Sequence, residues 1–188
     1  MNLHHTLAVA VALALLANVG VAEEKAALKS GPQVGKSVPG PFAPLNVNGS
    51  KAGEKNCLYC SNGNNPVVMI FARNTSPELT RLLKKVEGCC GKNKDAKLGS
   101  FVVFCSDDEK METKLKKEVK DSKLDKVVLA IDDKAGPEGY DVNKDADVTV
   151  VLYVERKVKS NFAFKKGEMK DKNIEAIEKA IPKILPAK

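Results

Sequence analysis

Three uninterrupted apolar runs dominate the hydropathy pattern of the chain, and they predict its central sheet. The runs are Val67–Ala72, Phe101–Cys105 and Val127–Ile131. A short apolar run without polar alternation is typical of a parallel strand that is covered on both faces. The segments between the runs are long enough for crossover helices. This pattern therefore predicts a β-α-β-α-β core.

Apolar residues with a helical period follow the first run. Ser76-Pro77-Glu78 predicts the start of a helix, because it offers an N-cap residue, a first-turn proline and a first-turn acid. Gly88 and Gly91 predict the end of this helix. The residues expected on its inner face are Leu79, Leu82, Leu83 and Val86.

Two more helices are predicted farther along the chain. Ser106-Asp107-Asp108-Glu109 predicts the start of a helix that carries acids in its first turn. The last helix is predicted from Asp171 to Leu185, with Pro182 bending it or ending its regular part. The residues expected on the inner faces are Met111, Leu115 and Val119 in the first of these helices, and Ile174, Ile177 and Ile181 in the last.

Antiparallel strands complete the predicted sheet. Val148–Val154 and Ser160–Phe164 predict a hairpin joined by the polar turn Glu155–Lys157. Phe42–Val47 predicts a short edge strand, since Pro44 is tolerated at an edge and not in the centre of a sheet. The elements together predict an α/β fold, with a central mixed β-sheet and helices on both of its faces.

The chain begins with a segment that predicts export. Residues 7–17 form an apolar stretch too short to span a bilayer, and Gly20-Val21-Ala22 offers the small residues of a signal-peptidase site. We therefore predict a signal peptide at residues 1–22, a flexible leader at 23–40 and one domain at 41–186. The mature protein is expected in the periplasm or secreted, without a stable membrane anchor after cleavage.

Composition excludes several classes of function. The formal charge of +7 is spread thinly, and the chain has three arginines and no tryptophan, so we expect no nucleic-acid partner. Both histidines precede the predicted cleavage site, which removes Ser-His-Asp and Cys-His mechanisms from the mature chain. We expect no cofactor, and we assign no residue as a metal ligand.

Cys57 and Cys60 form a C-x-x-C pair in a polar loop before the first apolar run, and they are the candidate catalytic residues. Three interpretations remain open for them. They form a structural disulfide, act as a thiol-disulfide redox pair with a protein partner, or bind a soft metal ion. A closed zinc site would need two more ligands, which Cys89 and Cys90 could supply only if the fold brought them to the loop. Cys105 ends an apolar run and is expected in the core.

The order of several short motifs resembles the redoxin branch of the thioredoxin-like superfamily, which includes the peroxiredoxin-like proteins. Val34-Gly35-Lys36-Ser37-Val38-Pro39 followed by Phe42–Leu45 is similar to the opening of redoxins, and residues 148–167 resemble their hairpin. Asp132 and Tyr140-Asp141-Val142 also fit the pattern. The loop and the strand Pro66–Arg73 resemble a group of exported planctomycete-type proteins. The resemblance implies a thioredoxin-like fold over residues 34–185.

The same resemblance shows where the chain departs from the family. The family's nucleophilic cysteine follows the first central strand, where this chain has Asn74–Glu78 and no cysteine. The family's cis-proline aligns with Val148. We therefore predict that the standard site is lost and that any thiol-disulfide exchange, or any peroxiredoxin-like antioxidant activity, uses the displaced pair Cys57 and Cys60. The alternative is a non-enzymatic binding or accessory module with a structural disulfide or a cysteine-based soft-metal site.

Overall fold

The computed structural model describes residues 28–186, so the predicted signal peptide lies outside the described residues. Six strands form one sheet in the order β1-β4-β3-β2-β5-β6. The strands are β1 (Leu45–Asn46), β2 (Val67–Ala72), β3 (Gly99–Cys105), β4 (Val127–Asp132), β5 (Val148–Val154) and β6 (Lys157–Phe164). The helices are α1 (Leu58–Asn62), α2 (Pro77–Lys92), α3 (Met111–Ser122), α4 (Asp171–Ala180) and the 3-10 turn η1 (Ile181–Ile184).

The three predicted apolar runs are the central strands of this sheet. β3 pairs in parallel with β2 on one side and with β4 on the other. β5 joins β2 in antiparallel orientation, and β6 extends the hairpin, so the sheet is mixed. Each of the six residues of β2 is buried, as expected of a strand covered on both faces.

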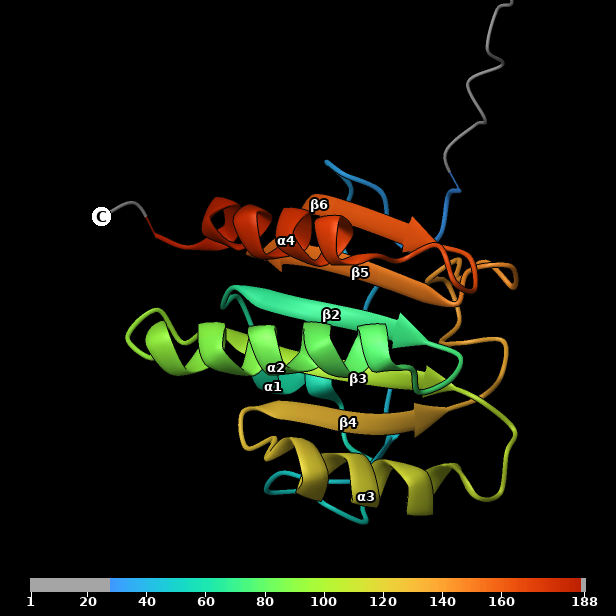
Figure 1. The fold of residues 1–188 in the computed structure, drawn as a ribbon. Helices are drawn as coiled ribbons and strands as arrows, with labels where there is room; N and C mark the ends of the chain where they lie inside the picture. Colours follow the sequence, from blue (N-terminus) through green and yellow to red (C-terminus); the bar gives the residue numbers. More distant parts are fainter. Residues whose placement is uncertain (1–27, 187–188) are drawn as a thin grey trace, which may run out of the picture.

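The two faces of the sheet are covered in different ways. α2, α3 and α4 all lie on one face, which Figure 1 shows toward the viewer. Within residues 28–186, the other face carries only the short helix α1 and segments without regular structure, which bring in Val38, Phe42 and Tyr140. The predicted helices therefore lie mainly on the first face. On the second face, the helical cover in the described part of the chain is the single short turn α1.

Helix boundaries differ from the prediction where packing outweighs local propensity. α2 continues through Gly88 and Gly91 to Lys92, because Cys90 on its inner face is only 3% exposed and extends the apolar contact with the sheet. α3 begins at Met111, later than predicted. Ser106 and Asp108 instead accept backbone hydrogen bonds from Asp108 and Lys110, which forms a turn before the helix.

The end of the last helix agrees with the prediction for Pro182. The regular helix α4 ends at Ala180, and Pro182 lies in the 3-10 turn η1 that follows. β6 begins at Lys157, three residues earlier than predicted, so the hairpin turn consists of Glu155 and Arg156.

Residues 28–40, which the sequence assigned to a flexible leader, are held against the sheet. The Oγ of Ser30 lies 2.6 Å from Oγ1 of Thr149, and both residues are buried. The backbone N–H of Gly35 donates to Val158 and that of Val38 donates to Arg156, at 2.9 and 2.8 Å. These bonds cover part of the exposed edge of β6, which explains why the segment is ordered.

Tyr153 offers a test of the packing beneath the second face. Its hydroxyl is buried and has no hydrogen-bond partner among the described residues, and burial raises its pKa. An unpaired buried hydroxyl costs about 1–3 kcal/mol. We expect Tyr153→Phe to raise the free energy of unfolding by about 1 kcal/mol in urea denaturation. A loss of stability would show that the hydroxyl has a partner.

Candidate functional site

The C-x-x-C pair lies at the start of α1, and the structure joins it as a disulfide. Cys57 is the N-cap residue of α1, and its Cα lies 5.2 Å from that of Cys60. Leu58 and Tyr59, the two residues between the cysteines, are 5% and 7% exposed and pack into the second face of the sheet. Burial of these two side chains fixes the short helix on the sheet, with Cys60 on the outside and Cys57 half-buried.

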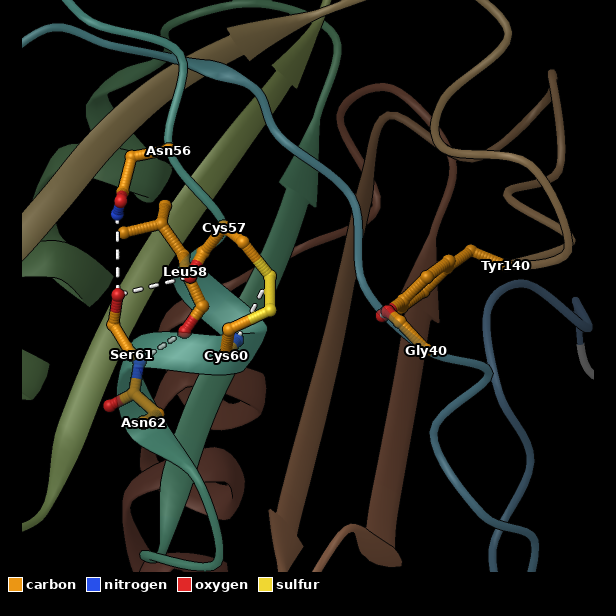
Figure 2. The surroundings of a disulfide bond; sticks show 8 residues. All are labelled: Gly40, Asn56, Cys57, Leu58, Cys60, Ser61, Asn62 and Tyr140. Carbon is orange, nitrogen blue, oxygen red and sulfur yellow. Dashed lines mark hydrogen bonds between the residues drawn. A yellow bond between two sulfur atoms is a disulfide. The ribbon is translucent and has the colours of Figure 1, made fainter.

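The two sulfur atoms of the disulfide have different surroundings. Cys60 is exposed, whereas Cys57 is half-buried. The Sγ of Cys57 accepts a hydrogen bond from the backbone N–H of Cys60 at 3.0 Å (Figure 2). A hydrogen bond of this kind favours the charged form of a sulfur. The arrangement therefore leaves Cys60 the more exposed of the two residues, and the Cys60 N–H would favour negative charge on the Cys57 sulfur if the disulfide were reduced.

Polar side chains brace α1 on the side away from the disulfide (Figure 2). The Nδ2 of Asn56 donates to Oγ of Ser61 at 3.3 Å, and that Oγ donates to the carbonyl of Cys57 at 3.0 Å. The Nδ2 of Asn62 donates to the carbonyl of Leu58 at 2.8 Å. A Cβ added at Gly99 would lie 1.9 Å from Oδ1 of Asn62, so glycine is needed there for α1 to approach β3.

An aromatic cluster lies beside the disulfide, and sequence reasoning did not identify it. The Tyr140 ring packs edge-on against Phe42 and Phe71, with ring centroids 4.9 and 5.6 Å apart. Its hydroxyl donates to the carbonyl of Gly40 (Figure 2). Burial raises the pKa of Tyr140. The sequence showed Phe42 and Tyr140 within two separate redoxin-like motifs, but it gave no sign that the two rings meet.

The segment between β2 and α2, where the resemblance to redoxins implies a nucleophilic cysteine, holds other residues. Asn74 and Ser76 lie between the end of β2 and the start of α2, and Ser76 caps the helix by accepting from the N–H of Leu79 at 3.1 Å. The backbone N–H of Arg73 donates to the carbonyl of Asp147 at 2.9 Å. Burial raises the pKa of Asp147, and a hydrogen bond from Asn74 opposes that shift. The segment Asn74–Glu78 thus carries a helix cap and no thiol.

The remaining cysteines are not part of the C-x-x-C site. Cys90 packs among the residues beneath α2 on the first face of the sheet, whereas Cys57 packs on the second face. The sheet therefore separates Cys89 and Cys90 from the disulfide, and a closed zinc site built from all four is wrong. Within residues 28–186, no group of three or more Cys, Asp or Glu side chains is placed to hold a metal ion.

Burial makes the free thiols poorly reactive. Burial raises the pKa of Cys90 to about 12 and that of Cys105 to about 12, and it raises that of Cys89 as well. Since the thiolate is the nucleophile, these thiols react slowly near neutral pH. The expectation that Cys105 belongs to the core is confirmed, because it is 2% exposed.

Comparison with known proteins gives structural matches only. No family model matches the sequence, and no curated protein matches it. Among solved structures, a candidate protein disulfide isomerase from Bacteroides thetaiotaomicron is similar at a TM-score of 0.62 and 18% identity, over 84% of this chain and 94% of that one. A candidate thiol:disulfide interchange protein DsbE from Chlorobium tepidum is similar at a TM-score of 0.59 and 18% identity, over 85% of this chain and 100% of that one.

Peroxidoxin BcpB from Mycobacterium tuberculosis is similar at a TM-score of 0.56 and 16% identity, over 85% of this chain and 99% of that one. Identities this low support a shared fold and not a shared activity. In the part of the chain that the structure describes, no helix is long and apolar enough to cross a membrane. The six-stranded mixed sheet, its flanking helices and these similarities show that the chain has a thioredoxin-like α/β fold.

Proposed function

We propose that the protein is an exported thiol-disulfide exchange protein that uses Cys57 and Cys60 in place of the lost standard site. One observation carries this proposal. The exposed Cys60 is joined by a disulfide to Cys57, and the sulfur of Cys57 also accepts a hydrogen bond from the backbone N–H of Cys60. Exchange is fastest when the attacked sulfur is accessible and the leaving thiolate is stabilised. The pair offers both conditions.

The exchange proceeds in two balanced steps. A thiolate of a partner dithiol attacks Sγ of Cys60, which forms a mixed disulfide and releases the thiolate of Cys57. The second thiol of the partner then attacks as a thiolate. It attacks the partner sulfur that is bonded to Cys60, closes the partner's disulfide and releases Cys60 as a thiolate. The partner gains a disulfide and Cys57 and Cys60 become thiols. In the opposite direction, the Cys60 thiolate attacks a partner disulfide, and Cys57 resolves the mixed disulfide.

A trapping experiment tests this assignment of roles. Cys57→Ser leaves Cys60 without its resolving thiol, so we expect the variant to accumulate a mixed disulfide with a peptide disulfide such as oxidised glutathione. Cys60→Ser is expected to trap much less, because Cys57 is half-buried. Peptide mapping by mass spectrometry identifies the trapped residue. Equal trapping in the two variants, or none, would contradict the mechanism.

Export is part of the proposal, because disulfides persist in oxidising compartments. The support is the pattern of residues 1–22, and N-terminal sequencing of native protein tests it. A mature chain that begins at Met1 would contradict cleavage after Ala22.

A non-enzymatic binding module is the second candidate, and one observation favours it. Cys57 caps α1 through the Cys60 N–H, and Leu58 and Tyr59 anchor the same turn in the core. The disulfide would then serve to hold α1 on the sheet. Turnover in the wild-type protein separates the two functions, since a purely structural disulfide does not speed the exchange between a dithiol and a peptide disulfide.

A further inference from the structure

The turn between β5 and β6 has a backbone conformation that its residues adopt at a cost. Glu155 has a φ of 52° and Arg156 a φ of 60°. Two-residue hairpin turns with positive φ at both central positions favour Asn-Gly, because side chains crowd the backbone there. A residue kept in such a conformation points to a role for its side chain.

The side chain of Arg156 contacts the C-x-x-C helix. Its Cζ lies 5.0 Å from the centroid of the Tyr59 ring, which is the range of a cation–π contact. Tyr59 directly precedes Cys60 in the chain. The turn is also held at the exit of α1, since the backbone N–H of Glu155 donates to the carbonyl of Asn64 at 3.0 Å.

The charge around this turn is positive. Arg156 and Lys157 are exposed, Lys36 lies beside them because Val158 donates to its carbonyl, and Lys55 precedes Cys57 by two residues. Within residues 28–186, none of these four side chains is in an ion pair. Glu155 is the one exposed acid within the turn. In the described part of the chain, Arg156 thus brings to Tyr59, which is next to Cys60 in the sequence, a positive charge that is in no ion pair.

We propose that Arg156 is a positioning and specificity-determining residue that makes the exchange site select anionic thiols, in particular cysteines flanked by acidic residues in a partner peptide. This inference rests on the proposed exchange at Cys57 and Cys60. The guanidinium restrains Tyr59, and with it α1, and its charge attracts both the attacking thiolate and the flanking carboxylates. A glycine at this position would relax the turn and supply neither effect.

The test compares two peptide thiols, acetyl-Glu-Cys-Glu-amide and acetyl-Lys-Cys-Lys-amide, as reductants of the Cys57–Cys60 disulfide. In each reaction two peptide thiols are oxidised to one peptide disulfide. The measured quantity is the second-order rate constant for the Glu-Cys-Glu peptide divided by that for the Lys-Cys-Lys peptide. This ratio is measured at low salt, in the wild-type protein and in each variant. Dividing the wild-type ratio by a variant's ratio cancels the different intrinsic reactivities of the peptides.

We expect Arg156→Gly and Arg156→Gln to lower the ratio by about fivefold or more, and Arg156→Lys to retain most of it. Glu155→Gly is the matched control, because it relaxes the same turn and keeps Arg156; its ratio should not fall. At 1 M salt, where the Debye length is about 3 Å, the wild-type and variant ratios should converge.

The outcomes separate this inference from the proposed function. An unchanged ratio in Arg156→Gly and Arg156→Gln, with the disulfide still reduced, overturns the role of Arg156 and leaves exchange intact. If neither peptide reduces the disulfide of the wild-type protein, the proposed exchange fails and the inference fails with it. A purely structural role of Arg156 would slow both peptides alike and would not move the ratio.

Discussion

Replacing either Cys57 or Cys60 with serine is expected to lower the rate of dithiol-disulfide exchange by at least about a hundredfold, because the reaction needs both an attacked sulfur and a leaving or resolving sulfur. The free thiols cannot replace them, since Cys90 and Cys105 are buried and Cys89 and Cys90 lie beneath the other face of the sheet. Reduction of insulin or of a peptide disulfide measures the effect.

The same variants are expected to lose little stability. A disulfide stabilises mainly by restricting the unfolded chain, and the ring closed by Cys57 and Cys60 is short. For such a ring the expected loss is about 2 kcal/mol, against about 3 kcal/mol for a 15-residue loop. Cys89→Ser is the control and should leave exchange unchanged. Turnover that persists in Cys60→Ser would rule out Cys60 as the attacked residue.

Tyr140→Ala is expected to lower the free energy of unfolding by about 3–5 kcal/mol, in the range of large aromatic truncations. Tyr140 is 1% exposed and packs between Phe42 and Phe71 over the second face of the sheet. Among the described residues no long helix covers this face, and Tyr140 is the largest buried side chain of the loop that carries it. Urea denaturation at equilibrium measures the loss.

The hydroxyl of Tyr140 provides the matched control. Because it donates to the carbonyl of Gly40, Tyr140→Phe should cost about 1 kcal/mol, whereas the same change at Tyr153, whose hydroxyl is unpaired, should stabilise the protein. A loss in Tyr140→Ala no larger than in Tyr140→Phe would show that the ring contributes little, and the second face would then be held by other contacts.

The sequence predicted the sheet well, because its three central strands are encoded by local patterns. Val67–Ala72 and Phe101–Cys105 are apolar at every position and could not face solvent in any arrangement. Boundaries were less predictable. The packing of Cys90 against the core extends α2 beyond Gly88, and this contact with the sheet has no local signature in the sequence.

The candidate site was predictable in part for the same reason. The spacing of Cys57 and Cys60 is local, and the structure joins them in a disulfide, which was one of the interpretations left open by the sequence. The contacts that distinguish the two sulfurs depend on the fold. Arg156 reaches Tyr59 from a hairpin turn almost a hundred residues farther along the chain, and Tyr140 comes from a loop without a periodic pattern. No spacing rule relates residues so far apart.

The reduction potential of the Cys57–Cys60 pair tests the central claim most directly. The protein is equilibrated in a series of glutathione or dithiothreitol redox buffers, free thiols are alkylated, and mass spectrometry gives the oxidised fraction of the pair apart from Cys89, Cys90 and Cys105. Because Cys60 is exposed and the Cys57 sulfur accepts the Cys60 N–H, we expect a potential of about −180 to −270 mV, in the range of exchange proteins. A potential below about −300 mV would mark an inert structural disulfide and contradict the account.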